Sequence, residues 1–226
     1  MPSPSVSDAM PVEEMQRLLD HAVHDLRAVF RRIGTTIEVF GDRNPKDAVY
    51  PSILDGVADG MAILSAIGTY STAVGFAHYS FKPMRADVSL DAALARLSGR
   101  IQETHATVSR GSLPEVVADR ERLTDLFYIL LANALTYRGD QAPTVDIRAR
   151  DESGEWIVSV QDNGIGIAPK YHADLFRPFY RLHGSELPGI GLGLATGKKI
   201  LEAHHGRIWL ESEAGAGATF SFSLPA

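Results

Sequence analysis

The first third of the chain carries a helical pattern of apolar residues. From residue 12 onward the apolar positions recur at steps of three and four, and only Thr36 interrupts the series. This spacing is typical of the a/d stripe of a heptad repeat and predicts one helix of about thirty residues. The stripe consists of Val12, Met15, Leu19, Ala22, Leu26, Val29, Ile33 and Phe40. Residues 41–45 end the helix, because glycine, asparagine and proline favour a turn there.

A second helical pattern follows at once. Its apolar side is formed by Ile53, Val57, Met61, Leu64, Ile67 and Val74. Four glycines lie within it, and each costs about 1 kcal/mol relative to alanine unless a neighbouring helix approaches closely. They are Gly56, Gly60, Gly68 and Gly75. Two long helices with a short connection predict an antiparallel hairpin. Two such hairpins pair into a four-helix bundle, so we expect a homodimer. Packing of the hairpin on its own chain remains the alternative.

The pattern changes after residue 80. Helices are expected at 90–97, 118–135 and 195–204, and strands at 113–117, 145–149, 156–160, 207–211 and 219–224. Residues 100–107 are a possible further strand. Helices mixed with antiparallel hairpins predict an α+β domain, a sandwich with its helices on one face of a sheet. We therefore expect a flexible leader at 1–10, a helical domain at 11–80 and an α+β domain at 81–226.

Composition and charge exclude several classes of protein. Hydrophobic residues make up 45% of the chain and charged residues 22%, as in ordinary globular proteins. A net charge of −6 disfavours a nucleic-acid binder with a wide basic face. The absence of cysteine excludes disulfides, a thiolate nucleophile and a cysteine-based zinc site. No secretory signal and no run of about 18–20 apolar residues are recognised, so we expect a cytoplasmic protein without a membrane partner.

Three glycine-bearing segments and one asparagine carry candidate chemistry. The segments are 162–167 after a strand, 189–194 before a helix, and 215–219. Glycine lets the backbone approach a ligand, and the N–H groups of a helix N-terminus bind phosphate oxygens. A single such loop also arises for steric reasons alone. Asn133 stands in an otherwise apolar helix, where its amide either satisfies a backbone group or supplies an oxygen ligand for Mg²⁺.

In combination, these segments resemble those of the sensor histidine kinases of two-component systems, especially the phytochrome-like branch. Residues 131–138 are similar to the N box, 162–166 to the G1 box, 175–179 to the F box, 189–193 to the G2 box and 215–219 to the last glycine box. Residues 24–28 resemble the H box. The resemblance runs from about residue 12 to the C-terminus. It implies a dimerisation and phosphotransfer bundle followed by a GHKL-type ATP-binding domain.

The resemblance also implies roles for individual residues. His24 would be phosphorylated from ATP with Asp25 as its hydrogen-bonding partner or base, and the phosphoryl group would pass to an Asp of a response-regulator receiver domain. Asp162 would accept from the adenine amino group, and Asn133 would hold Mg²⁺. The other positions implied to contact or shape the nucleotide site are Tyr137, Arg138, Gly164, Gly166, Ile167, Phe179, Gly189, Gly191, Leu192, Gly193, Leu194 and Thr219. A sensor domain would be a further partner, and none is recognised in these residues.

Residues 170–188 resemble the lid of the ATP site, which has to move before bound ATP can meet the histidine. Phe176 and Phe179 would pack this lid, although by pattern alone they are core aromatics. The heptad supports His24 independently. With Leu26 at a and Val29 at d, His24 falls at f, the outermost position, from which a phosphoacceptor can be reached.

Three residues depart from the family pattern. Ile129 and Thr136 stand where the N box usually has Asn and Lys, and Val29 stands where the H box usually has Pro. Lys198, Lys199 and Arg138 are candidates to replace the lost charge. The alternative function is a phosphotransfer or scaffold dimer with a degenerate ATP site. A GHKL ATPase acting as a clamp is disfavoured, because Ile129 cannot activate water as the Glu of those enzymes does.

Overall fold

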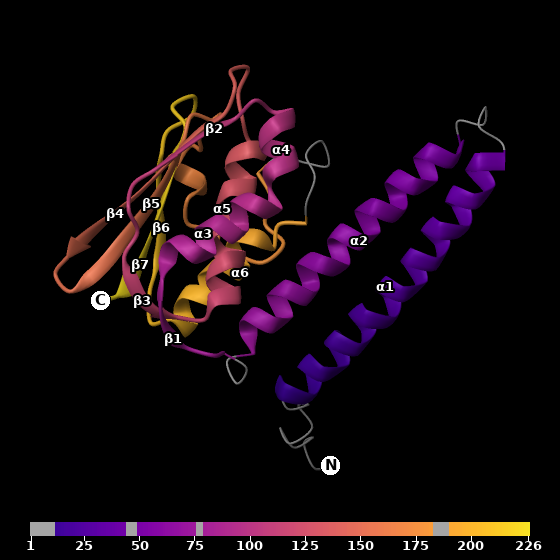
Figure 1. Cartoon of the computed structure of the whole chain (residues 1–226), viewed down its shortest axis with the longest axis horizontal. Coiled ribbons are helices and arrows are strands. Elements are labelled where there is room, and N and C mark those ends of the chain that lie inside the picture. The colour runs from indigo at the N-terminus through magenta and orange to yellow at the C-terminus, as the bar shows by residue number, and fades with distance from the viewer. Residues whose placement is uncertain (1–11, 44–48, 76–78, 183–189) are drawn as a thin grey trace, which may run out of the picture. The chain divides into compact units, whose positions relative to one another are not determined.

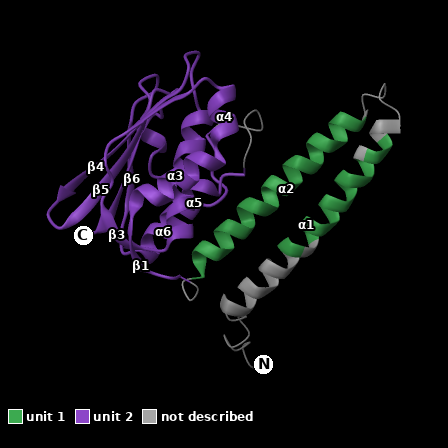
Figure 2. Ribbon diagram, viewed as in Figure 1, with its two compact units in different colours: residues 1–75 green, residues 76–226 purple. Residues whose placement is uncertain are grey.

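The computed structural model describes residues 12–43, 49–75, 79–182 and 190–226. The chain divides into two compact units, Met1–Gly75 and Phe76–Ala226 (Figure 2). The first is a helical hairpin and the second an α+β unit built on a sheet (Figure 1). The predicted fold class, a hairpin followed by a GHKL-type sandwich, is confirmed.

The hairpin pairs α1 (Val12–Arg43) with α2 (Val49–Val74). The glycines of α2 allow the close contact between them. A Cβ on Gly60 would lie 2.5 Å from Cε1 of Phe30, and one on Gly68 would lie 3.5 Å from Cγ1 of Val23. Gly56 differs, because nothing lies within 4 Å of the position of its Cβ. Close helix packing therefore accounts for Gly60 and Gly68 and leaves Gly56 unexplained.

Where its side chains are described, from Leu26 onward, the heptad stripe of α1 does not face α2. Leu26 is 47% exposed and Ile33 is 41% exposed, whereas Val23 is buried. The residues that contact α2 lie on a neighbouring stripe of α1 that includes Val23, Phe30 and Gly34. A single hairpin has one internal interface, so it cannot cover both stripes. The described a/d residues Leu26, Val29 and Ile33 therefore form an apolar surface that the hairpin leaves open, here called the open stripe.

Helix α2 also bears on the expectation that no segment could span a membrane. By length and composition its segment Tyr50–Val74 passes as a possible span, with a mean hydropathy of 1.2 and 6% of the window buried. This single candidate does not overturn the expectation. The indication from one such helix is weak, because Asp55 and Asp59 lie within it and both are exposed. Carboxylates are costly in a bilayer, whereas the helices of a bundle carry them on their outer faces.

The second unit places its helices on one face of a sheet (Figure 1). The five-stranded sheet has the order β2-β4-β5-β7-β6. Its strands are β2 (Thr107–Arg110), β4 (Thr144–Glu152), β5 (Glu155–Asp162), β6 (Ile208–Ser212) and β7 (Ala218–Pro225). Strands β1 (Lys82–Arg85) and β3 (Glu115–Ala118) form a separate antiparallel pair. All pairs in the large sheet are antiparallel except β2 with β4, which run parallel.

Helices α3 (Ala86–Arg96), α5 (Arg120–Thr136) and α6 (Gly193–Ala203) cover the sheet. The core between the layers contains a pair of buried aromatic rings. Phe127 of α5 meets Phe222 of β7 edge to face with ring centroids 5.7 Å apart, and both are fully buried. This burial fixes the face that α5 turns to the sheet, and so determines which of its residues face away.

One predicted element is wrong. The possible strand at 100–107 is instead α4 (Ser98–Glu103) followed by a turn, and β2 begins at Thr107. The backbone N–H of Ile101 donates to the carbonyl of Leu97 at 2.9 Å, which continues the helical path after α3. Arg, Gln and Glu in this segment are good helix formers, and that preference outweighs the single isoleucine.

Candidate nucleotide site

Helix α5 presents one side to the sheet and another side to the candidate site. Asp119 starts the helix, because its carboxylate accepts the N–H of Arg122 at 3.0 Å. Phe127 packs on Phe222 of the sheet and Leu126 lies 3.1 Å from the position of a Cβ on Gly197 of α6, whereas Ile129 and Asn133 are partly exposed. Within the described residues, the side-chain amide of Asn133 makes no hydrogen bond. The first alternative for Asn133, that it satisfies a backbone group, is therefore not what the structure shows.

Asp162 ends β5 and is largely buried. Its Oδ1 accepts the N–H of Gly164 at 2.8 Å and the N–H of Ala218 at 3.1 Å. Burial raises the pKa of this carboxyl above its ordinary value, and the two backbone hydrogen bonds partly oppose that rise. In the described part of the chain Oδ2 accepts no hydrogen bond. The carboxylate is thus held rigidly by one oxygen and offers the other to a donor such as an exocyclic amine.

The end of α5 and the glycine loops form one continuous backbone cradle. The carbonyl of Tyr137, directly after α5, accepts the N–H of Ile165 at 3.0 Å, and the carbonyl of Ile165 accepts the N–H of Gly215 at 2.7 Å. Glycine is required at position 164, where a Cβ would lie 2.4 Å from the oxygen of Tyr137. The N-box and G1-box segments, far apart in sequence, are therefore directly joined.

Sequence reasoning missed Ser212, which joins two of these loops. Its Oγ accepts the N–H of Ile167 at 2.8 Å and donates to the carbonyl of Gly217 at 2.6 Å. No sequence signal marked this residue, because a serine at the end of a strand is common. Ile167 and Thr219 are partly exposed on either side of this connection. Gly166 has a positive φ of 64° in the same loop.

Helix α6 begins at Gly193, so the first turn of the helix follows the G2 segment. The N–H groups of a first turn have no partners within the helix and suit phosphate oxygens. Leu192 is buried, which leaves only its backbone for such a role, and Leu194 is partly exposed. Gly191 accepts the N–H of Phe179 at 2.9 Å. Gly189 lies outside the described residues.

Ile129 lies beside this helix start. A Cβ on Gly193 would be 3.4 Å from Cγ2 of Ile129. The apolar side chain thus borders the candidate phosphate region rather than the carboxylate of Asp162. Ile129 offers no polar group to a phosphate. On the side of α5 that faces the candidate site, Asn133 therefore has the side chain that can bind a phosphate-bound cation.

The interpretation of Phe179 as a core aromatic is wrong. Its side chain is 67% exposed and its backbone has a positive φ of 63°. Phe176, by contrast, is partly buried. The segment includes a 3₁₀ turn, η2 (Pro169–Tyr171), and is described up to residue 182. An exposed phenylalanine in the lid region is available to a ligand or to another surface.

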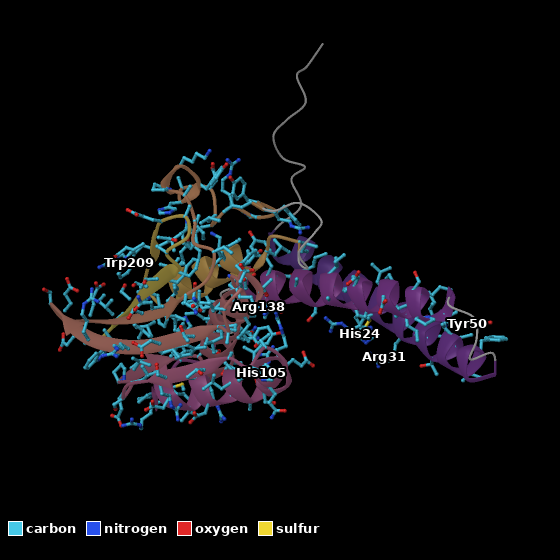
Figure 3. All side chains as sticks on the ribbon, turned by 90° about the horizontal axis from the view of Figure 1, so that it is seen from above. His24, Arg31, Tyr50, His105, Arg138 and Trp209 are labelled. Carbon is cyan, nitrogen blue, oxygen red and sulfur yellow. The ribbon has the colours of Figure 1, made fainter. Side chains whose placement is uncertain are left out.

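The donor set suits Mg²⁺ only together with phosphates. Among the described residues there is no cluster of three His, Asp or Glu side chains able to hold a metal ion. Mg²⁺ is commonly bound through one or two protein oxygens plus substrate phosphates, and the amide oxygen of Asn133 fits that pattern. Arg138, one residue after Tyr137, is exposed (Figure 3).

The candidate phosphoacceptor lies in the other unit. His24 is exposed on α1 (Figure 3). The expected exposure of His24 is observed, although the stripe of α1 that packs on α2 contains Val23 and Phe30 and not the a/d residues Leu26 and Val29. The side chain of Asp25 lies outside the described residues, and its role stays a prediction.

Comparison with known proteins decides the family. Residues 118–226 match the family described as histidine kinase-, DNA gyrase B-, and HSP90-like ATPase. The chain is 36% identical over 219 residues to cyanobacterial phytochrome A of Nostoc sp., an alignment that covers 94% of this chain and 28% of the relative. This chain belongs to the sensor histidine kinases with a GHKL-type ATPase domain.

Solved structures agree with the fold of this sensor histidine kinase. Full-length ShkA in complex with AMPPNP matches with a TM-score of 0.72 and 24% identity, covering 93% of this chain and 46% of that one. Histidine kinase ThkA in complex with the response regulator protein TrrA matches with a TM-score of 0.60 and 20% identity, covering 95% and 64%. The chain spans about a quarter (28%) of the length of the phytochrome relative.

Proposed function

We propose that this chain is an ATP-dependent protein histidine kinase that phosphorylates itself on His24 and passes the phosphoryl group to an aspartate of a response regulator. One observation carries the proposal. The partly buried carboxylate of Asp162, the amide of Asn133, which is unpaired among the described residues, and the start of α6 border one cradle, while an exposed histidine stands on a separate hairpin. Two such parts are what a phosphotransfer between domains needs.

The chemistry assigned to the cradle is positioning and charge neutralisation. Asp162 accepts the adenine amino group through Oδ2, and the N–H groups at the start of α6 bind phosphate oxygens. A Mg²⁺ ion held by Asn133 would neutralise charge on the phosphates. An imidazole nitrogen of His24 then attacks the γ-phosphorus, the bond to the β–γ bridging oxygen breaks, and ADP leaves. Asp25 holds the proton on the other ring nitrogen.

The proposed assembly is a homodimer through the hairpin. The open stripe of Leu26, Val29 and Ile33 is an apolar surface that a second copy would cover as the second half of a four-helix bundle. The response regulator is proposed from the family and from the ThkA neighbour, which is in complex with such a protein. A cytoplasmic location belongs to the same proposal.

A second candidate function has one observation in its favour. Ile129 places an apolar side chain against the start of α6, where the family has an asparagine. A chain that no longer used ATP would act as a phosphotransfer or scaffold dimer.

The deciding experiment incubates the chain with γ-labelled ATP and Mg²⁺. We expect label that is lost in acid and retained in base, as for a phosphoramidate, and no label on His24→Gln. Arg31→Gln, a substitution on the same exposed side of α1, is the matched control and should label normally (Figure 3). Absence of nucleotide binding at millimolar ATP would favour the scaffold, and label on His24→Gln would contradict the acceptor assignment.

A further inference from the structure

The structure holds a guanidinium group at the C-terminal turn of α5. Nη2 of Arg100, on α4, donates to Oγ1 of Thr136 at 2.9 Å. The hydroxyl of Thr136 in turn donates to the carbonyl of Ala132 at 2.7 Å, so its orientation is fixed and its lone pairs face Arg100. Arg100 is partly buried. Its charged group is thus positioned by a specific contact rather than extended into solvent.

This guanidinium lacks a compensating carboxylate. Across the described residues no Asp or Glu lies within ion-pair distance of Arg100. Its neighbour Arg96 shows the contrast, because it pairs with Asp125 at 2.9 Å and stacks over the ring of Tyr128 at 4.3 Å. A partly buried cation whose hydrogen-bond partner is neutral, with no carboxylate beside it in the described structure, makes its surroundings a favourable place for an anion.

The group lies on the face of α5 that borders the candidate site. Residues three and four apart on a helix are neighbours on its surface, so Thr136 lies next to Asn133. One turn earlier on the same face Ile129 borders the start of α6. The unpaired amide of Asn133 therefore lies between the guanidinium at one end and the first turn of α6 at the other. The guanidinium and the N–H groups of the first turn suit phosphate oxygens, and the amide oxygen of Asn133 suits a cation bound to the phosphates.

Other cations are less well placed. Lys199 of α6 is already paired with Glu202 at 2.7 Å, and Lys198 and Arg138 are exposed. Of the cationic side chains around this face, Arg100 combines partial burial, a fixed orientation and the lack of a carboxylate in the described structure.

We propose that Arg100 binds the phosphate groups of ATP beside Asn133, and so supplies from α4 a positive charge that α5 itself does not provide. This inference rests on the proposed function. It adds helix α4 to the nucleotide site. This helix comes before all three glycine loops in the chain and is not part of them. A charge-assisted hydrogen bond to phosphate is stronger than a neutral one, so the contribution is measurable in affinity.

The test compares ATP with adenosine, which lacks phosphates, by calorimetric titration of the full chain with Mg²⁺ present. Arg100→Gln should weaken ATP binding by about tenfold and leave adenosine binding unchanged. Arg100→Lys should retain part of the affinity for ATP. Thr136→Val removes the contact that orients the guanidinium and should cost about threefold for ATP alone. Arg96→Gln is the matched control, because that arginine is already neutralised by Asp125.

Equal losses for ATP and adenosine in Arg100→Gln would overturn the proposal, since they would indicate a structural role such as interaction of the cation with the C-terminal end of α5. Unchanged ATP affinity in Arg100→Gln, with the wild type binding ATP, would overturn this inference and leave the proposed function standing. Failure of the wild type to bind ATP would overturn both. The Thr136→Val variant provides an independent readout if Arg100→Gln does not fold.

Discussion

The imidazole of His204 accepts, through Nε2, the backbone N–H of Asp119 at 3.0 Å. Its Nδ1 lies 2.8 Å from the carbonyl of Ile200, so the neutral tautomer with the proton on Nδ1 satisfies both contacts. Asp119 also accepts the N–H of Ser80 at 2.7 Å. The ring of Phe81 packs edge-on against the imidazole at 5.0 Å. A buried histidine thus holds together the start of the second unit, the N-cap of α5 and the end of α6.

This contact predicts a pH-dependent stability. Burial lowers the pKa of His204 in the folded protein below its ordinary value of about 6.5, so the unfolded chain binds the proton more readily. The stabilisation is present above about pH 6.5 and is lost as the pH falls toward the lowered pKa. Urea unfolding should give a smaller free energy of unfolding at about pH 5.5 than at about pH 7.5.

His204→Leu supplies the check on that assignment. It leaves the N–H of Asp119 without an acceptor, which should cost about 1–3 kcal/mol at neutral pH. It should also flatten the pH dependence. His105→Asn, at an exposed position with a positive φ of 53°, should keep the wild-type dependence. A pH dependence unaltered by His204→Leu would mean that another group is responsible.

Asp162→Asn tests the adenine contact. The asparagine keeps an oxygen for the N–H groups of Gly164 and Ala218 but offers an amide where the carboxylate offered Oδ2. Loss of a hydrogen bond to a charged group should weaken both ATP and adenosine by about tenfold to a hundredfold. The control is Asp146→Asn on β4. Its carboxyl has a lowered pKa, because Arg148 and Ser109 hydrogen-bond to it, and we expect no effect on nucleotide affinity.

Two of the glycines of α2, Gly56 and Gly60, should respond to alanine with opposite signs. Gly56→Ala introduces a methyl group into open space and should stabilise the helix by about 1 kcal/mol. Gly60→Ala places its Cβ 2.5 Å from the ring of Phe30 and should destabilise the hairpin by about 1–3 kcal/mol. Denaturant unfolding followed by far-UV circular dichroism measures both. Stabilisation by Gly60→Ala would show that the helices do not pack as described.

Ile33→Glu tests the open stripe as the dimer surface. A glutamate there would be buried without a partner in a four-helix bundle, so the dimer dissociation constant should rise by about a hundredfold or more. Sedimentation equilibrium gives this constant directly. Arg32→Gln, an exposed position on the same helix, should leave it unchanged. A monomeric wild type at the concentrations tested would refute the dimer.

Local patterns in the sequence were sufficient for most elements. The heptad spacing located α1, and alternation bounded by turn residues located β4, β5, β6 and β7 to within a few residues. The strand expected at 100–107 is wrong, because the six residues of α4 contain too little periodicity to distinguish a helix from a strand. The parallel pairing of β2 with β4 depends on contacts between distant segments, which a local pattern does not encode.

The sequence by itself determined the hairpin and the α+β unit, because repeat spacing and residue chemistry are local properties, and its resemblance to the family implied the candidate roles of His24, Asn133 and Asp162. Only the tertiary structure decided that the heptad stripe faces away from α2 and that Ser212 joins two glycine loops. It also decided that Arg100, not one of the expected cations, contacts Thr136. Each of these three contacts or exposures depends on which surfaces meet when elements distant in sequence pack together. The packing of the whole core determines which surfaces meet.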